Sequence, residues 1–372
     1  MRLTVETEAL ATALRQASTC AKKVDGVLGH VLLEAADGCL TLSAMDMVRE
    51  VKVGIPAQVS IPGSRTARAS LLAIMANSSR ADIHIEFDGS HLRAKSGRSS
   101  LDIPSLDPDI YRGMPLQLNA ASFTFANSEF QRTLSEVAFC ANEASPVPSG
   151  QGINVYPAEP QSDGAGRDWV IWASDGKKMM EVQLNAPSGE AEFQPFIYPI
   201  QSAKIAAALF PSEVGQVEVS VSRSMVAIVD DHASFVTTLL DGKMSMGYRN
   251  WLAPGPHVVK ADREELLSSI GLVSAAFENV GISCSDGMMR LHTRNTDTSA
   301  GSSELAVEGE LPFSVTVDAP YLIAVLRALK GSQVSLRFAG DQNRPFLVQD
   351  GREGVTCVVA PLSQLARAQH AA

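Results

Sequence analysis

The sequence predicts an α+β protein built of three tandem, similar domains, each with two helices packed on antiparallel sheets. Three observations support this prediction. The length of 372 residues exceeds one ordinary core, and the hydrophobic content of 45% can fill several. A fixed order of strand and helix patterns also recurs three times, with Leu106, Leu240 and Leu362 at equivalent places.

Each third begins with a short strand followed by an amphipathic helix. The strands start at Leu3, Phe123 and Val258. Apolar residues three or four positions apart mark the buried face of each helix. These apolar residues are Leu10, Leu14 and Ala17, then Phe130, Leu134 and Val137, then Leu266, Leu267 and Ile270.

A strand pair around a polar turn comes next. The turn is Asp37-Gly38 in the first third and Asp286-Gly287 in the last, and Asp-Gly supplies the positive φ that tight hairpins need. In the middle third, a longer polar loop separates the strands 153–155 and 169–172.

A second helix and a strand series complete each third. The helices are predicted over 69–76, 200–209 and 320–329, and Pro320 stands where a first-turn proline is tolerated. The closing strands alternate apolar and polar residues, which predicts one buried and one solvated face for each sheet.

Prolines and glycines predict the boundaries between the thirds. Met114-Pro115 and Ala253-Pro254-Gly255-Pro256 break regular structure. We therefore expect domains over residues 1–115, 116–254 and 255–372, with 363–372 as a C-terminal extension.

Composition excludes several classes of protein. The net charge of −10 disfavours a nucleic-acid binder held by bulk charge, although a local basic lining is compatible with it. Five cysteines without close spacing indicate free thiols in a reducing compartment. We find neither a leader-like apolar region nor a membrane-length apolar run, so the sequence predicts a cytoplasmic protein.

The motifs of common catalytic sites are missing from the sequence. It has no phosphate-binding G-x-x-x-x-G-K-[ST] and no H-E-x-x-H. Asp230-Asp231-His232 lies between two alternating strands, so we expect a hairpin turn there and not a metal site. The sequence predicts no catalytic residues, no metal and no cofactor.

Triplication favours a curved scaffold with its helices on one side. Such an arc can close on a second copy, because head-to-tail contacts form rings when the rotation closes. A ring that encloses a long partner needs few strong contacts, which suits the negative net charge. Two alternatives stay open: an enzyme with a site between triplicated domains, and a monomeric interaction scaffold.

Several segments together carry a resemblance to a known family through their order and spacing. They are Asp37-Gly38 to Leu42 with Asp46-Met47, Ser96 to Ser99 followed by Leu106, Ser174-Asp175-Gly176, Leu240 to Lys243 followed by Tyr248-Arg249, Tyr321 to Leu329, and Val358 to Leu362. On these segments the chain resembles the bacterial DNA polymerase III beta subunit, the sliding DNA clamp, to about Leu362.

The resemblance implies the DNA clamp fold and a homodimeric, head-to-tail ring around duplex DNA of any sequence. In DNA replication such a ring is a processivity factor with no chemistry of its own. It implies that the replicative polymerase, the clamp loader and repair proteins bind through short hydrophobic peptides in a cleft between the second and third domains. Carried over by position, the cleft residues are Gly150, Ser174, Gly176, Lys177, Lys178, Met179, Met246, Asn250, Trp251, Pro345, Phe346, Val358, Val359, Ala360, Pro361 and Leu362.

The resemblance also implies DNA-lining and dimer-interface positions. The lining residues are Lys22, Lys23, Ser149, Gln201, Lys204, Phe277 and Tyr321, and the interface residues are Leu101, Ile103, Leu272 and Val273. Five arginines on or near the repeated helices are further lining candidates or part of a solvated charged face: Arg15, Arg80, Arg132, Arg263 and Arg327.

The chain departs from the family pattern at the cleft. Lys177-Lys178-Met179 stands where the family usually shows His-Arg-Leu, and the segment Met244–Tyr248 is one residue longer than its usual counterpart. The sequence is therefore identified as a divergent member, and we expect its partner peptides to differ from the usual ones.

Overall fold

The computed structural model describes residues 1–21, 24, 26–116, 121–126, 128–158, 168–188, 192–211, 215–245, 247–294 and 299–362. Contacts divide the chain into two compact units. Unit 1 is Met1–Arg132, Pro187–Phe193 and Gln201–Leu239, and unit 2 is Thr133–Ala186, Gln194–Ile200 and Leu240–Ala372. The division into three domains at 115 and 254 stays a prediction.

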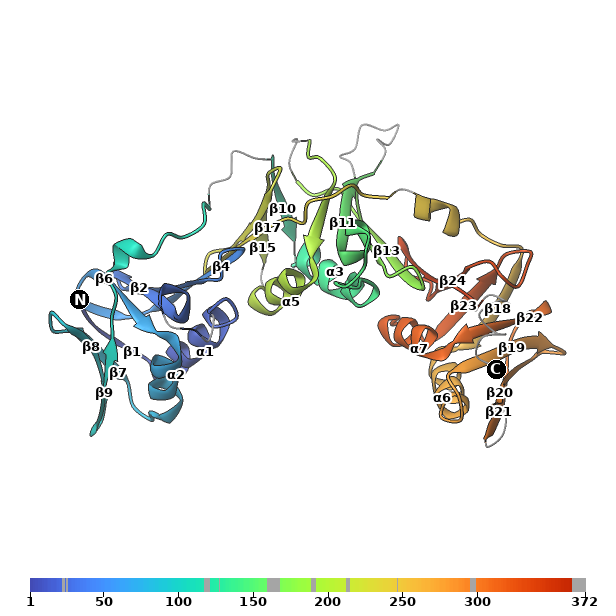
Figure 1. Ribbon diagram of the computed structural model, residues 1–372, viewed down its shortest axis with the longest axis horizontal. Coiled ribbons are helices and arrows are strands. Elements are labelled where there is room, and N and C mark those ends of the chain that lie inside the picture. Colours follow the sequence, from blue (N-terminus) through green and yellow to red (C-terminus); the bar gives the residue numbers. More distant parts are fainter. Residues whose placement is uncertain are drawn as a thin grey trace. The chain divides into compact units, whose positions relative to one another are not determined.

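Unit 1 contains two antiparallel sheets (Figure 1). The smaller sheet has five strands in the order β5 (Gln58–Ile61), β1 (Arg2–Val5), β7 (Ile83–Phe87), β8 (His91–Ser96) and β9 (Ser99–Pro104). The larger has eight, in the order β10 (Ala121–Ala126), β15 (Gln216–Val221), β16 (Met225–Val229), β17 (Ala233–Thr238), β4 (Arg49–Pro56), β3 (Cys39–Met45), β2 (His30–Ala36) and β6 (Gly63–Arg68).

The helices α1 (Thr7–Ala17) and α2 (Ala69–Ser78) pack on each other in unit 1, and α1 also packs on β3 and β4. The buried face of α1 is Leu10, Ala13, Leu14 and Ala17, as its apolar spacing predicts. Two helices, α3 (Glu129–Val137) and α5 (Ile200–Leu209), begin in one unit and end in the other. Short 3-10 segments are η1 (Val27–Gly29) and η2 (Pro108–Ile110).

Unit 2 likewise contains an eight-stranded and a smaller antiparallel sheet (Figure 1). The large sheet runs β14 (Phe196–Pro199), β11 (Gly152–Pro157), β12 (Trp169–Ser174), β13 (Lys178–Leu184), β25 (Val355–Val359), β24 (Phe346–Gln349), β23 (Gln333–Phe338) and β18 (His257–Asp262). The small sheet runs β21 (Ala300–Ala306), β20 (Met288–Arg294), β19 (Asn279–Ser285) and β22 (Leu311–Asp318).

The helices of unit 2 include the long pair α6 (Arg263–Ser274) and α7 (Ala319–Ala328), which pack on each other. Helix α7 also packs on β13 and β25 and so covers one face of the large sheet there. The shorter helical elements are η3 (Ala138–Cys140), α4 (Pro148–Gln151) and η4 (Gly247–Trp251).

The structure confirms the α+β class, the six helices and the turns that the sequence predicts. Asp37 and Gly38 have φ of 50° and 76°, and Asp286 and Gly287 have 55° and 72°. Asp230 starts a hairpin turn, because its Oδ1 accepts the backbone N–H groups of His232 (2.8 Å) and Ala233 (2.7 Å).

One prediction about the strands is wrong. The closing strands β16, β24 and β25 do not keep a solvated face, since Val226–Ile228, Phe346–Val348 and Cys357–Val359 are buried without a break. In unit 2 the reason is that both faces of the strand β25 are packed against other parts of the chain. Helix α7 lies against one face of β25, and an aromatic cluster described below covers Val358 on the other.

All five cysteines are free thiols, and four of them are buried. Burial raises the pKa of the Cys20 thiol to about 12 and that of Cys284 to about 11. No helix in the described part of the chain is long and apolar enough to cross a bilayer.

Candidate functional site

Strand register brings three of the predicted cleft residues together in unit 2. Ser174 of β12 pairs with Met179 of β13, and Met179 pairs with Val358 of β25. Val358 in turn pairs with Leu347 of β24. Paired residues of adjacent strands point to the same face of a sheet, so these four side chains form one row. We call it the apolar row.

Leu347 was missed by sequence reasoning, which selected its neighbour Phe346. Phe346 pairs with Val359 and stacks on Phe338 of β23, with ring centroids 4.7 Å apart. Because side chains alternate along a strand, Phe346 and Val359 lie on the opposite face from Leu347 and Val358. The predicted cleft is therefore corrected here: the side chains of Phe346 and Val359 cannot line it. Alternation within β24 puts Phe346 and Leu347 on opposite faces, and only the pairing with β25 shows which of them shares the face of Val358.

The apolar row packs in one buried cluster with three aromatic side chains, Tyr156 of β11, Trp172 of β12 and Tyr248 of η4, which we call the aromatic cap. The rings of Trp172 and Tyr248 lie 4.1 Å apart at 31°. In this cluster Met179 is 0% exposed and Val358 1% exposed. Neither side chain is therefore open to solvent in this chain.

The reachable apolar surface belongs to the segment that carries Tyr248. Met244, Trp251 and Leu252 are partly buried and pack against the same cluster. Ala360, Pro361 and Leu362, which follow β25, are also partly buried. Apolar side chains that are half-exposed over a packed base offer area for a further apolar partner group.

Hydroxyl groups fix the aromatic cap to the sheet. The Tyr248 hydroxyl donates to Glu181 Oε2 at 2.8 Å and lies 2.6 Å from the Tyr156 hydroxyl. Arg249 Nη2 donates to the Tyr156 hydroxyl at 3.2 Å. Burial raises the pKa of the Glu181 carboxyl, while the bond from Tyr248 and the charge of Arg249 oppose that rise. Sequence reasoning missed Glu181, Tyr156 and Trp172, because an acid and two aromatics in strands give no local signal of contact.

The hairpin between β12 and β13 is closed by its own polar groups. Asp175 Oδ1 accepts the N–H groups of Lys177 and Lys178, each at 2.9 Å, and Lys178 Nζ lies 2.5 Å from Asp175 Oδ2. Gly176 has φ of 85°, a conformation in which a side chain is strained. Lys178 also sits 5.2 Å from the ring of Tyr321, whereas the side chain of Lys177 is exposed.

Backbone bonds hold the segment after β25 beside this hairpin. The N–H of Ala360 donates to the carbonyl of Lys177, and that of Leu362 donates to the carbonyl of Thr316, both at 2.8 Å. Five predicted cleft residues therefore meet at this hairpin: Ser174, Gly176, Lys177, Lys178 and Ala360.

The remaining predicted cleft residues fall into three groups. Gly150 lies beside β12, since a Cβ built there would be 3.5 Å from the carbonyl oxygen of Ser174. Asn250 is exposed and Pro345 is half-buried. Met246 lies outside the described residues.

The predicted DNA-lining residues differ in how far their side chains are exposed to solvent. Gln201 and Lys204 are exposed on α5, and Phe277 and Tyr321 are half-buried. The assignment of Ser149 to the DNA lining is corrected, because its side chain is buried. Lys22 and Lys23 lie outside the described residues.

Arg263 is removed from the candidates for the DNA lining, because its side chain is used inside unit 2. Its Nε donates to the carbonyl of Gly331 (2.7 Å) and its Nη1 to that of Leu326 (3.2 Å). These carbonyls stand at and just beyond the carboxyl end of α7, where backbone acceptors lack helical partners. Arg263 thus joins α6 to the end of α7, a structural role. Arg15, Arg80, Arg132 and Arg327 are exposed.

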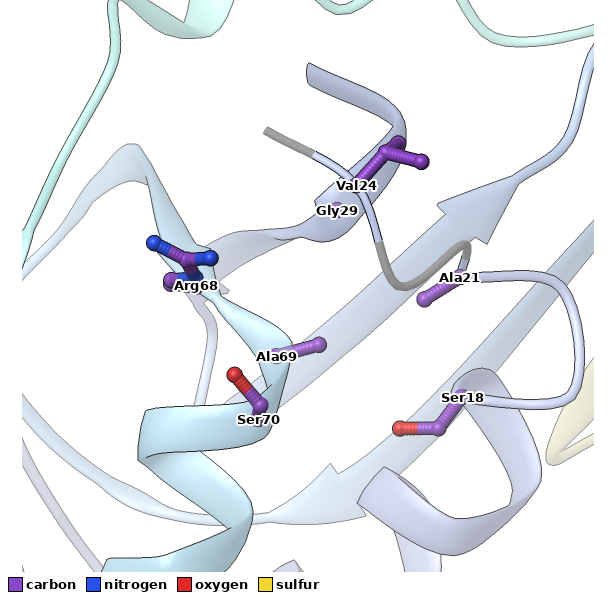
Figure 2. Close-up of a pocket in the computed structure, with 7 residues that line it drawn as sticks. All are labelled: Ser18, Ala21, Val24, Gly29, Arg68, Ala69 and Ser70. Atoms are coloured by element: carbon purple, nitrogen blue, oxygen red, sulfur yellow. The ribbon is translucent and has the colours of Figure 1, made fainter. Parts of the chain in front are cut away.

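A cavity of about 360 Å³ opens in unit 1 where α1 ends and α2 begins (Figure 2). Arg68 ends β6 and directly precedes α2, which carries Ala69 and Ser70 on the same wall of the cavity. Ala21 and Val24 flank the positions of Lys22 and Lys23 in the sequence. The lining residues are Ser18, Ala21, Val24, Gly29, Arg68, Ala69 and Ser70.

Two of the four predicted interface residues have accessible side chains. Leu272 is 70% exposed on α6, and Leu101 is half-buried on β9. The assignment of Ile103 and Val273 to the dimer interface is corrected, since both side chains are wholly buried within their own units. Strand β9 ends its sheet in unit 1, and β21 ends the small sheet of unit 2, so each has one unpaired edge in this chain.

Comparison with known proteins finds relatives of one kind. The family model described as "DNA polymerase III beta subunit, N-terminal domain" matches residues 1–115. A beta sliding clamp of Caulobacter vibrioides is 24% identical over 374 residues, which cover 97% of this chain and 100% of that protein. The chain is thus similar to beta sliding clamps over nearly its whole length. The beta sliding clamp of Escherichia coli K12 is 22% identical over 379 residues, with the same coverage.

Solved sliding clamps share the fold of this chain. The DNA polymerase sliding clamp of Caulobacter crescentus matches with a TM-score of 0.87 and 25% identity, over 98% of this chain and 100% of that one. A Pseudomonas aeruginosa sliding clamp bound to griselimycin matches with a TM-score of 0.90 and 21% identity, over 98% and 99%. The match over the full length of the chain agrees with the predicted resemblance. The identity to these relatives is low, at 21–25%.

The described residues hold no group of three or more His, Cys, Asp or Glu side chains arranged to bind a metal ion. The chemistry that the described surface does offer is apolar contact over the aromatic cap, with lysine and arginine side chains nearby. This suits recognition of another macromolecule.

Proposed function

We propose that the chain is a sliding clamp: a homodimeric ring that encircles duplex DNA and acts as a processivity factor for the replicative polymerase in the cytoplasm. The observation that carries the proposal is the match along the whole chain to beta sliding clamps in sequence and fold. The ring would consist of domains 1–115, 116–254 and 255–372 in each of two copies. It would hold DNA by enclosure, which a chain of net charge −10 can do.

Retention on DNA tests this function. After loading by a clamp loader, the protein should stay on nicked circular DNA and leave linear DNA through its free ends. Gel filtration of the DNA-bound fraction measures this directly. Equal retention on open linear DNA would reject enclosure.

Ring closure is proposed through the exposed edges β9 and β21, with Leu272 packed at the contact. Leu272→Lys should convert dimers to monomers in analytical ultracentrifugation, because it places a charge in an apolar interface. Ile74→Lys is the matched control, since Ile74 is another exposed apolar helix residue, 58% exposed on α2. A dimer that tolerates Leu272→Lys would contradict this interface.

The partner site is proposed on the half-buried apolar residues over the aromatic cap. Trp251 would be the central contact, with Pro361 and Leu362 beside it. Large aromatic side chains commonly dominate such contacts. Solved clamps of Pseudomonas aeruginosa and Bartonella birtlesii are bound to griselimycin, which makes this molecule a suitable probe.

Isothermal titration with griselimycin tests the partner site. Trp251→Ala should weaken binding by at least about tenfold, which is typical of an aromatic hot spot. Tyr111→Phe in unit 1 is the control and should bind like the wild type. Equal affinity of Trp251→Ala and the wild type would place the partner site elsewhere.

The inner DNA-facing surface is proposed to include Gln201, Lys204 and Arg68. Arg68 stands at a cavity whose lining flanks Lys22 and Lys23 in the sequence. Basic side chains there would contact phosphates without reading the bases. Lys204→Glu together with Arg68→Glu should lower the salt concentration at which loaded clamps are lost from circular DNA. An unchanged salt limit would remove both residues from the lining.

A further inference from the structure

Glu181 is a half-buried acid in the middle of the large sheet of unit 2. Its neighbours across the sheet are Trp172 in β12 and Thr356 in β25. It stands two residues beyond Met179 on the same strand, so it shares the face of the apolar row. A carboxylate in such surroundings needs hydrogen-bond donors to offset its desolvation.

The donor that Glu181 receives belongs to the 3-10 segment η4. The hydroxyl of Tyr248 donates to Glu181 Oε2 at 2.8 Å and meets the hydroxyl of Tyr156 at 2.6 Å. Arg249, the next residue of η4, donates to Tyr156. Two side chains of η4 are therefore bound to the sheet through one connected set of polar groups.

The same segment carries Trp251. In a 3-10 helix residues three apart lie above one another, so Tyr248 and Trp251 share one side of η4. Both pack against the cluster that contains Met179 and Val358. A shift of Tyr248 away from the sheet would therefore carry Trp251 with it.

Unit 1 uses a similar device at a corresponding place. There Glu50 of β4 accepts the N–H of Met114 at 2.6 Å and the hydroxyl of Tyr111 at 3.3 Å. Both donors lie in the segment that follows β9, as η4 lies in the segment that follows β17. A buried acid that holds a connecting segment on a sheet thus occurs twice in the chain.

We infer that Glu181 is a positioning residue of the partner site: its carboxylate holds Tyr248 and, through η4, sets the place of Trp251. This inference rests on the proposed partner site. Glu181 need not touch the partner itself, because it acts on η4 through its hydrogen bond with the Tyr248 hydroxyl. Its effect on binding should therefore pass through Trp251.

Griselimycin titration of four variants tests the inference. Glu181→Leu removes the acceptor and should weaken binding about fivefold to tenfold, the effect of one hydrogen bond to a charged group. Glu181→Gln keeps an oxygen that can accept the Tyr248 hydroxyl and should bind within about twofold of the wild type. Tyr248→Phe removes the same bond while it keeps the ring, and should resemble Glu181→Leu. Glu50→Gln in unit 1 is the matched control and should bind normally.

A double-mutant cycle separates positioning from a general loss of structure. If Glu181 acts through Trp251, then Glu181→Leu should cost almost nothing in a Trp251→Ala background. Thermal melting of each variant shows whether it is folded at the temperature of the titration. Should Glu181→Leu not fold, Tyr248→Phe carries the cycle alone.

Three outcomes are informative. Wild-type affinity in both Glu181→Leu and Tyr248→Phe overturns the inference while the partner site stands. An equal loss with and without Trp251 also overturns it. A wild-type protein that does not bind griselimycin refutes the partner site, and the positioning role fails with it.

Discussion

The two units carry the same row of three paired residues with different chemistry at its centre. In unit 1 the row is Met45, Glu50 and Val236, across β3, β4 and β17. In unit 2 the corresponding row is Ser174, Met179 and Val358, across β12, β13 and β25. Each follows a hairpin of the same design, since Asp46 and Asp175 accept the N–H groups two and three residues ahead.

The central residue decides how the connecting segment is held. In unit 1 the carboxylate of Glu50 lies within the row itself and accepts two donors from the segment around Tyr111. In unit 2 the row centre is Met179, and the acid stands two residues away at Glu181. In unit 2 the hydrogen-bonding acid is therefore displaced from the apolar row. Tyr248 bonds to this acid and also packs on the ring of Trp172. The position of one acid along the central strand therefore decides the chemistry of the row. With the acid at the row centre, as in unit 1, the row contains a hydrogen-bonded carboxylate. With the acid two residues away, as in unit 2, the row centre is apolar.

Copying the acid of unit 1 into unit 2 should have the largest effect. Met179→Glu would bury a carboxylate at a wholly buried position in an apolar and aromatic cluster, and we expect a loss of about 3–5 kcal/mol of stability. Met179→Gln is the uncharged control and should lose less. Urea denaturation measures both. A Met179→Glu protein as stable as the wild type would show that the row is open to water.

Removing the acid of unit 1 should have the next largest effect. Glu50→Leu leaves the N–H of Met114 and the hydroxyl of Tyr111 without their acceptor, at a cost of about 1–3 kcal/mol. Hydrogen exchange should show faster exchange of the Met114 amide in this variant. Glu50→Gln retains an acceptor and should keep most of the protection, and identical exchange in all three proteins would refute the anchoring role.

The same acid predicts a pH dependence. Burial raises the pKa of the Glu50 carboxyl above its ordinary 4.5, against the opposing effects of Lys52, Met114 and Tyr111. The folded state then holds its proton to higher pH than the unfolded chain. This contribution to stability is complete below about pH 4.5 and is lost as pH rises through the raised pKa. Glu50→Gln removes the contribution, so melting temperatures compared from pH 4.5 to 7 should fall less in the variant than in the wild type. A parallel pair of curves would contradict the raised pKa.

The smallest effect should come from the basic partner in each hairpin. Arg49 donates to Asp46 Oδ2 through Nε (3.0 Å) and Nη2 (2.5 Å), whereas Lys178 donates to Asp175 through Nζ alone (2.5 Å). We expect Arg49→Ala to cost about 1 kcal/mol and Lys178→Ala about half of that. Thermal melting of both variants checks the order, and a larger loss in Lys178→Ala would reverse the comparison.

The resemblance predicted many residues of the site, but it could not predict which of their side chains are buried. The resemblance selected Ser174, Met179 and Val358, and register does align them. It could not reveal that Met179 and Val358 are buried in one cluster with Trp172 and Tyr248, because burial depends on what a distant segment places on top. Phe346 was preferred to Leu347 because pairing across β24 and β25 sets the face, and neither strand alone shows it.

Local patterns by themselves determined the six principal helices, the Asp-Gly and Asp230 turns, and the threefold order of elements. Each of these depends on residues within a few positions of one another, through apolar spacing or the φ that a turn requires. Tertiary structure alone decided that β17 joins β4 and that β13 joins β25, which makes two eight-stranded sheets out of separate repeats. Those pairings connect residues more than 170 positions apart, and only the packed fold brings such strands, and the acids and tyrosines they carry, into contact.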